Sequence, residues 1–354
     1  MDPDAVDAVE RVPHGGTRDR DVLEFSANVN PERPEGVGAA YERALVAATR
    51  YPDDEYPAFR DAAADYVSRD AERDLEREHV VPTPGGLAAL RLAFATTLTP
   101  GDEALVPAPS FGEYAREVRL QGATPRFAPH DAVVDLDAAA LDAAAMVVVC
   151  NPNNPTGEAV DAAALRALAA RCRTAGTVLL VDEAFLGFTS EPTLAGEPGA
   201  IVARSLTKLF GLPGLRAGFA VATGRERDRL RAARRTWNLG APAAAVGAHC
   251  LRDRAFVDAT RDRVATERAR VVNALPEGVA AYDATSERDG VAPFVLLELD
   301  DRDPGAFVAD ARDRGVAVRD ATTFRGLDAH VRVAVRTRAE NDELLAALSA
   351  VVDA

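Results

Sequence analysis

Continuous apolar runs that end in polar residues restrict the fold of this chain more than any other feature. Residues 146–150 read Met-Val-Val-Val-Cys, and residues 177–181 read Thr-Val-Leu-Leu-Val before Asp182. Such runs are typical of strands covered on both faces. A helical pattern over 162–172 separates them, and this alternation predicts a mostly parallel sheet with helices on both sides, an α/β fold. The other expected strands are 80–82, 104–106, 200–204 and 216–221, and the other expected helices are 56–69, 87–98 and 111–120.

The pattern changes after about residue 235, where longer helical stretches precede short strands. This change predicts a smaller C-terminal α+β domain behind the large one. We therefore expect an N-terminal segment over 1–35 that contributes to the active site, a large domain over 36–238 and a small domain over 239–354. The elements expected in the last part are helices 243–251, 256–275, 304–314 and 339–352 and strands 294–299, 316–319 and 331–335.

Charge and cysteine content exclude several classes of protein. The formal net charge of −15 over 354 residues argues against nucleic acid or an anionic membrane as partner, because both would be repelled. The three cysteines are widely spaced and indicate neither a disulfide framework nor a metal site. No signal peptide or run of 18 apolar residues is visible, so we expect a cytoplasmic protein. The acidity resembles that of halophilic proteins, and a high-GC genome remains an equally open explanation.

Polar motifs follow three of the expected strands directly. The turn Asn151–Gly157 follows the first buried run, Asp182 follows the second, and a loop containing Lys208 follows the strand 200–204. Ligands of parallel sheets bind at the carboxyl ends of the strands. We therefore expect these motifs to meet in one crevice.

Lys208 is the one lysine among the 41 basic residues of the chain. An arginine stays protonated at any working pH, whereas a desolvated lysine amine can lose its proton and condense with a carbonyl. Lys208 is therefore predicted to be a nucleophile rather than a surface lysine left over by composition. The spacing Ser205-x-x-Lys208 also matches a serine-nucleophile motif, but the partner motifs S-D-N and K-T-G are absent.

The neighbours of Lys208 indicate what its amine condenses with. Ser205 and Thr207 supply hydroxyls, and the glycines at 211 and 214 let the backbone approach a ligand closely. Arg216 carries a planar fork that suits a phosphate. An amine beside hydroxyls and an arginine predicts a site for a phosphorylated aldehyde, pyridoxal 5'-phosphate.

These segments together resemble the fold-type I pyridoxal-phosphate enzymes of the aspartate aminotransferase superfamily. The resemblance covers nearly the whole chain, because the matching blocks stand in the family's order. It implies the pyridoxal-phosphate-dependent transferase fold, with a cofactor-binding large domain. The blocks are Tyr51-Pro52, Gly85-Gly86, Pro109–Phe111, Asn151–Gly157, Asp182–Ala184, Ser205–Arg216, and Arg332 with Glu340-Asn341.

The resemblance assigns cofactor roles to individual residues. It implies that Lys208 binds the cofactor covalently and later moves protons, that Asp182 pairs with the pyridine nitrogen, and that Phe111 stacks on the ring. Asn154 would donate to the phenolic oxygen of the ring, beside residue 185, which is Phe here and Tyr in many transaminases. The remaining implied contacts are to the cofactor phosphate: Gly86, Leu87, Ser205, Arg216, and Tyr51 of a neighbouring subunit in a homodimer.

Two branches of the superfamily fit, and they differ in substrate. L-Threonine-O-3-phosphate decarboxylases carry a His-Gly-Gly segment and a Phe-Ser-Ala-Asn-x-Asn-Pro block, which this chain matches at His14–Gly16 and Phe25–Pro31. They also tend to carry Asp-Glu-Ala-Phe and a last strand Arg-Val-Ala-Val-Arg, as here at 182–185 and 332–336. Histidinol-phosphate aminotransferases share the general pattern, including an arginine like Arg319 for a substrate phosphate. This chain departs from the decarboxylases at Arg325, where proline is usual, and in lacking an asparagine near Gly85-Gly86.

The expected substrate contacts follow from that resemblance. Arg332 would bind the α-carboxylate, and the phosphate would be bound by Arg319, His14 and the amides of Gly15 and Gly16. Asn28 is also placed among the substrate-binding residues. On the strand 331–335, alternation puts Arg336 on the same face as Arg332, where it contributes to the crevice or is a solvated edge charge. The His14–Gly16 segment on its own could equally be an ordinary turn.

We therefore expect a lyase that decarboxylates L-threonine O-3-phosphate to (R)-1-aminopropan-2-yl phosphate for cobalamin biosynthesis. The alternative is a histidinol-phosphate aminotransferase or a related class I/II aminotransferase. Regulators that use this fold without catalysis carry a DNA-binding domain ahead of it, and the 30 or so irregular residues before the fold leave no room for one. No metal is expected.

Overall fold

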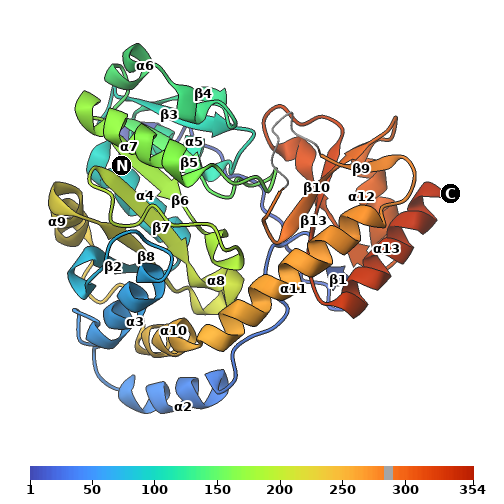
Figure 1. Ribbon diagram of the computed structural model, residues 1–354, viewed down its shortest axis with the longest axis horizontal. Coiled ribbons are helices and arrows are strands. Elements are labelled where there is room, and N and C mark those ends of the chain that lie inside the picture. The colour runs from blue at the N-terminus through green and yellow to red at the C-terminus, as the bar shows by residue number, and fades with distance from the viewer. Residues whose placement is uncertain (283–289) are drawn as a thin grey trace.

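The computed structural model describes residues 1–282 and 290–354, and a seven-stranded sheet lies at its centre (Figure 1). The strand order is β2-β8-β7-β6-β5-β3-β4. The pairings from β7 to β4 are parallel, whereas β8 runs antiparallel to both neighbours, so the predicted mostly parallel sheet is confirmed. The strands are β2 Val80–Thr83, β3 Glu103–Ala108, β4 Thr124–Pro129, β5 Met146–Cys150, β6 Val178–Asp182, β7 Ala200–Ser205 and β8 Gly218–Ala222.

Side chains of the central strands alternate between two cores, as the pleat requires. On β6, Leu179 and Val181 join the core on one face of the sheet, and Leu180 joins the core on the other. Helices supply the apolar side chains that complete both layers. The first face is covered by α3 Pro57–Ser68, α7 Ala162–Ala175 and α10 Ala241–Arg252, and the second by α4 Gly86–Thr97, α5 Glu113–Leu120 and α9 Gly224–Ala233.

A second sheet forms the core of a smaller unit, at the right of Figure 1. Its strands are antiparallel and stand in the order β12-β13-β10-β9. A short parallel pair, β1 with β11, joins the N-terminal segment to this unit. The elements are β1 Leu23–Glu24, β9 Val279–Ala281, β10 Phe294–Leu299, β11 Val316–Ala317, β12 Arg319–Asp320, β13 His330–Ala334, α12 Pro304–Asp313 and α13 Arg338–Val352.

The long helix α11, Arg254–Asn273, runs from one unit to the other (Figure 1). Its Val257 and Val264 belong to the large core, and its Val272 packs against the small core. Helix α10 also packs into the large core, although it follows residue 239. Phe25 of the N-terminal segment is buried in the small core. The division at 35 and 238 therefore stays a prediction, and the packing passes from one core to the other within α11.

Several boundaries differ from those expected. The helix expected from residue 111 begins at Glu113, because residues 109–112 form the turn after β3. The strand expected over 316–319 is two short strands, β11 and β12, which pair in different sheets. Among the described residues, no helix is both long and apolar enough to cross a bilayer. Elements that were not expected are α1 Pro3–Val6, α2 Val37–Ala47, β1, β4, α6 Ala138–Asp142, α8 Leu206–Leu209, α9 and β9.

Candidate active site

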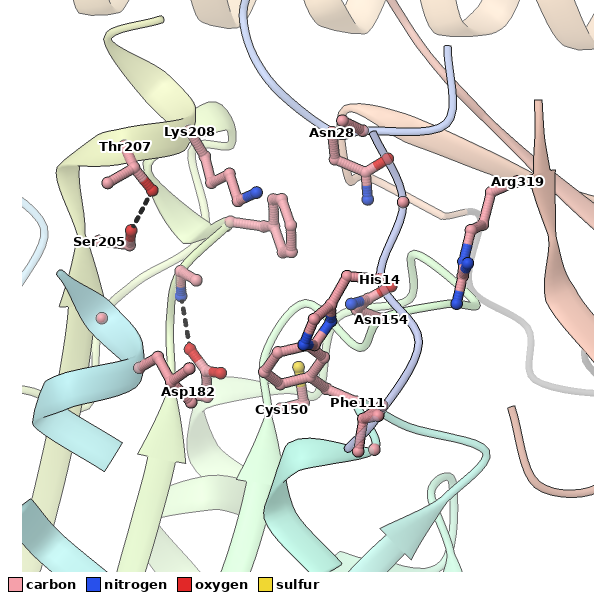
Figure 2. A pocket seen from close by; sticks show the side chains of 18 of the residues that line it. His14, Asn28, Phe111, Cys150, Asn154, Asp182, Ser205, Thr207, Lys208 and Arg319 are labelled. Carbon is pink, nitrogen blue, oxygen red and sulfur yellow. Dashed lines mark hydrogen bonds between the residues drawn. The ribbon is translucent and has the colours of Figure 1, made fainter. Parts of the chain in front are cut away.

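A cavity lies at the carboxyl ends of β5, β6 and β7, between the two units and the N-terminal segment (Figure 2). This is the place where the strand pattern predicted that the polar motifs would meet. It brings together residues that the sequence distributes over more than 300 positions. The predicted residues that line it are His14, Gly15, Asn28, Gly86, Leu87, Phe111, Asn154, Asp182, Phe185, Ser205, Lys208, Arg216, Arg319 and Arg332.

Lys208 lies on the short helix α8, directly after β7, and its amine points into the cavity (Figure 2). Burial lowers the pKa of Lys208 to about 8, and the charges of Arg332 and Arg216 act in the same direction. Asp182 opposes the shift. Lys208 therefore loses its proton more readily than an exposed lysine, which is what a nucleophilic amine requires.

Asp182 is the last residue of β6, and its side chain is buried. The Tyr114 hydroxyl donates to Asp182 Oδ2 at 2.6 Å, and the Ala184 amide donates to Oδ1 at 3.0 Å. Burial raises the pKa of this carboxyl, while the hydrogen bond from Tyr114 lowers it. A carboxylate held in this way can accept a hydrogen bond from a protonated group of a ligand in the cavity.

The N-terminus of α4 forms one wall together with the loop around Lys208. The amides of its first turn have no carbonyl partner within the helix and favour an anion. A Cβ at Gly85 would lie 2.7 Å from Arg216 Nη2, and one at Gly86 would lie 2.9 Å from Ser205 Cβ. Glycine at both positions therefore brings the helix end, a hydroxyl and a guanidinium together. Thr207 completes the group through a 2.7 Å contact between its hydroxyl and that of Ser205.

Arg332 on β13 is buried in the opposite wall. Its Nη1 donates to Asn154 Oδ1 at 2.5 Å and its Nη2 to the Ser26 carbonyl at 2.9 Å, while its Nε has no partner among the described residues. Burial and the nearby Arg319 lower the pKa of Arg332 to about 9. A buried guanidinium without a carboxylate partner favours an anionic ligand in the cavity.

The N-terminal segment closes the cavity beside Arg319. Arg319 Nη2 donates to the Pro13 carbonyl at 2.9 Å and to Thr323 Oγ1 at 2.8 Å. His14 Nε2 lies 3.0 Å from Glu113 Oε1. The segment passes close to Ser26 at Gly15, where a Cβ would lie 2.2 Å from the Ser26 carbonyl oxygen, so only glycine allows this approach. Arg319 thus supplies a guanidinium on this side of the cavity, beside the His14-Gly15 segment from the other end of the chain.

Three predicted residues do not line the cavity. The Gly16 amide donates to Ser26 Oγ at 2.8 Å. Arg336 is half-buried and bonds to Glu340 Oε1 at 2.7 Å, so it neither faces the crevice nor lies free at an edge. Tyr51 is 78% exposed and stacks on the Trp237 ring with centroids 4.2 Å apart.

Other residues that line the cavity were not among the predicted set. Tyr114 was missed although it stands three positions after Phe111, a spacing that can bring two side chains together at the start of a helix. Cys150 was missed although it ends β5 beside Asp182, its register partner. Thr207 was noted only for its hydroxyl. The full set of additional lining residues is Val12, Pro13, Ser26, Ala27, Leu90, Gly112, Tyr114, Cys150, Ala184, Thr207, Pro213, Thr323 and Phe324.

Comparison with known protein families identifies the family to which this chain belongs. The family described as aminotransferase class I and II matches residues 20–348. The chain belongs to this family, which confirms the superfamily and the fold that the sequence motifs predicted.

Similar proteins of two named activities cover nearly the whole chain. A threonine-phosphate decarboxylase of Salmonella typhimurium is 32% identical over 354 residues, with 92% of this chain and 90% of that protein covered. A histidinol-phosphate aminotransferase of Halobacterium salinarum is also 32% identical, over 362 residues, with 94% and 93% covered.

Solved structures share the fold. L-Threonine-O-3-phosphate decarboxylase from Porphyromonas gingivalis superposes with a TM-score of 0.81 at 22% identity, covering 94% of this chain and 100% of that chain. Histidinol-phosphate aminotransferase from Sinorhizobium meliloti, in complex with pyridoxal-5'-phosphate, superposes with a TM-score of 0.79 at 21% identity, covering 94% and 91%.

The cofactor of this chain is pyridoxal 5'-phosphate, as for its family. The residues of the cavity fit this group in three ways. The glycine-walled end of α4 with Ser205 and Arg216 suits a phosphate, and Lys208 supplies an amine for the aldehyde. Asp182, buried without an ion-pair partner among the described residues, suits a ring nitrogen that carries a proton.

Proposed function

We propose that this enzyme decarboxylates L-threonine O-3-phosphate to (R)-1-aminopropan-2-yl phosphate, a step of cobalamin biosynthesis. The observation that carries the proposal is the contact between Arg319 and the Pro13 carbonyl. Through it, the His14-Gly15 segment stands beside a guanidinium on the substrate side of the cavity. The arrangement suits a second phosphate, separate from that of the cofactor.

The cofactor would be held by the residues at the strand ends. The end of α4, Ser205 and Arg216 would bind its phosphate, Asp182 its ring nitrogen and Lys208 its aldehyde carbon. Phe111 would stack on the ring and Asn154 would bond its phenolic oxygen. Bound in this way, the cofactor supplies an electron sink that stabilises negative charge developing at the substrate Cα. The side chains of the protein would orient the substrate and transfer protons.

Arg332 would determine which bond of the substrate breaks. The bond perpendicular to the plane of the cofactor ring breaks, because only that bond overlaps the π-system. Arg332 is held on one side by Asn154 and on the other by the Ser26 carbonyl, so its guanidinium has a fixed direction. A carboxylate bound to it is therefore fixed relative to the ring. For decarboxylation the clamp would hold the Cα–carboxylate bond upright, and Lys208 would then deliver a proton to Cα.

Arg319, His14 and the Gly15 amide would bind the substrate phosphate. Burial lowers the pKa of Arg319, which indicates that this guanidinium is poorly solvated, yet it remains charged at any working pH. Charge-assisted hydrogen bonds to a phosphate are roughly twice as strong as hydrogen bonds between neutral groups. A phosphorylated substrate would thus be selected over its unphosphorylated analogue.

The alternative is a histidinol-phosphate aminotransferase, and a specific observation favours it. The Halobacterium salinarum relative with that name matches this chain at the same 32% identity as the decarboxylase relative. Phe185 favours the decarboxylase, because it packs edge-on against Phe294 and offers no hydroxyl to the cofactor ring. The same clamp would serve an aminotransferase if it held the Cα–H bond upright.

A direct assay separates the two activities. The cofactor-loaded protein is mixed with threonine phosphate and released CO2 is measured; in parallel, histidinol phosphate and 2-oxoglutarate are supplied and glutamate is measured. We expect CO2 from threonine phosphate and very little from free threonine. Steady glutamate formation without CO2 release would replace the proposal by the alternative.

Substitution of the two arginines tests the assigned phosphate and carboxylate contacts. Arg319→Ala should reduce kcat/KM for threonine phosphate about ten- to a hundredfold and change the residual rate with free threonine little. Arg332→Ala should reduce both rates, because both substrates carry the same carboxylate. Arg314→Ala, which removes an exposed arginine of the same unit, is the matched control and should change neither rate. Equal losses with both substrates in Arg319→Ala would remove that residue from the phosphate site.

A further inference from the structure

We propose that Tyr114 is a positioning residue that holds Asp182 in the ionised form and direction needed by the ring nitrogen of the cofactor. The proposal rests on the role given above to Asp182, but not on which substrate the enzyme uses. Tyr114 lies on the first turn of α5 and is fully buried, and its ring belongs to the apolar core on one face of the sheet. Its hydroxyl donates to Asp182 Oδ2 at 2.6 Å.

The sheet itself brings these groups together. Cys150 and Asp182 are register partners at the ends of the parallel strands β5 and β6. On β6, Asp182 has the same parity as Leu180, so both point to the face that α4 and α5 cover. Tyr114 belongs to the apolar core on this face. The contact between its hydroxyl and the carboxylate therefore follows from strand register and helix placement.

The charge state of Asp182 depends on hydrogen bonds, because no guanidinium or ammonium group among the described residues forms an ion pair with it. Burial is the largest influence on its pKa and raises it, and the neighbouring Glu183 acts in the same direction. The opposing influences are the hydrogen bond from Tyr114, the Ala184 amide and, more weakly, the charge of Lys208. Removing the Tyr114 hydroxyl would therefore remove the principal group that keeps this carboxyl ionised.

Tyr114 is suited to act as a permanent donor. Burial and the adjacent carboxylate raise its pKa well above the ordinary value, so the phenol keeps its proton at any working pH. Its ring is fixed edge-on against Phe111, with centroids 5.5 Å apart and an interplanar angle of 83°. Since the ring alone makes this contact, Tyr114→Phe removes the donor and leaves the packing in place.

The test compares two ligands on the full-length, cofactor-free protein. One is pyridoxal 5'-phosphate, and the other is its analogue in which the ring nitrogen is replaced by carbon. The Kd of each is measured by fluorescence titration. Tyr114→Phe should weaken binding of pyridoxal 5'-phosphate about tenfold or more, since it removes a hydrogen bond to a charged group, and should change binding of the carbon analogue less than about twofold.

Two further variants separate the possible outcomes. Tyr66→Phe is the matched control, because Tyr66 is also buried but belongs to the core on the opposite face of the sheet, and it should leave both Kd values unchanged. Asp182→Asn should abolish the preference for the nitrogen-containing ligand. An equal loss of affinity for both ligands in Tyr114→Phe, or no loss for either, would overturn the proposal.

Measurements on the wild-type protein show whether a negative result concerns the role of Tyr114 or the role proposed for Asp182. If wild type binds both ligands equally well, Asp182 does not contact the ring nitrogen, and the cofactor role assigned to it is wrong. If wild type prefers the nitrogen-containing ligand and Tyr114→Phe retains that preference, only the role of Tyr114 is wrong. Neither outcome depends on whether the substrate is threonine phosphate or histidinol phosphate.

Discussion

Lys208 is the one lysine of the chain. Burial lowers its pKa to about 8, and the charges of Arg332 and Arg216 act in the same direction. The chain therefore offers a single side-chain amine for covalent attachment of the cofactor. Borohydride treatment of the loaded protein should fix the cofactor to one peptide, residues 205–216, detectable by mass spectrometry. Lys208→Ala should give no such adduct. A side-chain adduct in that variant would disprove the assignment, because no second lysine exists to form one.

The lowered pKa of Lys208 also predicts how stability depends on pH. Below about pH 8 the folded protein carries a buried, repelled ammonium group; between about pH 8 and the ordinary value of 10.5 the folded state releases this proton while the unfolded state still holds it. The cost of burying the charge is therefore greatest below pH 8 and declines as the pH rises. At pH 7 the cofactor-free Lys208→Met variant should melt roughly 2–5 °C above wild type. The difference in Tm should shrink toward pH 10; a difference independent of pH would show that the gain comes from packing.

Sequence reasoning located the residues of the site whose positions follow from strand ends. Asp182 was predicted because it stands directly after an apolar run, and Lys208 because it is the one lysine of the chain, in a loop that follows the expected strand 200–204. Tyr114 was missed, and Arg336, which was predicted among the substrate-binding residues, does not line the cavity, because the positions of both depend on other elements. Alternation was extended to Arg336, but β13 ends at Ala334, and the side chain then turns to Glu340 in the capping box that begins α13.

At the scale of elements, the approach of β8 to the start of α4 depends on a single missing side chain. A Cβ at Gly218 would lie 2.6 Å from the Gly85 carbonyl carbon and 2.7 Å from both the Gly86 nitrogen and the Arg204 carbonyl oxygen. These are backbone atoms and cannot rotate away. The end of α4 therefore reaches Ser205 only because residue 218 is glycine.

Gly218→Ala should displace the start of α4 and thus weaken binding of the cofactor phosphate. We expect a loss of about 1–3 kcal/mol in the free energy of unfolding and a cofactor Kd raised about tenfold. Thermal melting of the cofactor-free protein and fluorescence titration measure the two effects. The control is Gly240→Ala, since a Cβ at Gly240 meets no atom within 4 Å and residue 240 does not line the cavity. Equal changes of stability and of cofactor Kd in the two variants would show that the close approach of β8 to α4 does not depend on Gly218.

The predicted strands are marked in the sequence by runs of apolar residues, and the missed ones are not. Strand β5 is buried on both faces, so every residue is apolar and its bounds were predicted in full. Strand β4 lies at the edge of the sheet and exposes most of its residues, so no apolar run marks it. Strands β11 and β12 were predicted as one strand over 316–319, and their division into two-residue strands follows from pairing with different strands, β1 and β13. No periodic pattern can predict such short pairings.

At the scale of the whole molecule, several exposed apolar residues lie on helix α2, Val37–Ala47, and just after it. Helix α2, at the lower edge of Figure 1, exposes Leu45 and Val46 by 48% and 79%. Tyr51 follows it and is stacked on the half-exposed Trp237, outside its own cavity. We propose a homodimer in which Tyr51 reaches the cofactor phosphate of the partner subunit.

Substitution on α2 tests this dimer. Val46→Asp should shift the protein from dimer to monomer in sedimentation velocity and should weaken cofactor binding, because Tyr51 would no longer reach the other copy. Val6→Asp changes an equally apolar, 47% exposed residue on α1 and serves as the control that should remain dimeric. A wild-type protein that sediments as a monomer at micromolar concentration would contradict the proposal.

The pairing of β1 with β11 has a consequence for the order in which the protein is made. Leu23 leaves the ribosome long before its partner Val316. The strand ends that carry Asp182 and Lys208 are complete well before the strand that carries Arg332 exists. The segments that carry the residues proposed to hold the cofactor therefore leave the ribosome before those that carry Arg319 and Arg332. The N-terminal segment can pair with β11 only after residues 316–317 have been made, so the wall that contains His14 and Arg319 is completed after the strand ends beside Asp182 and Lys208.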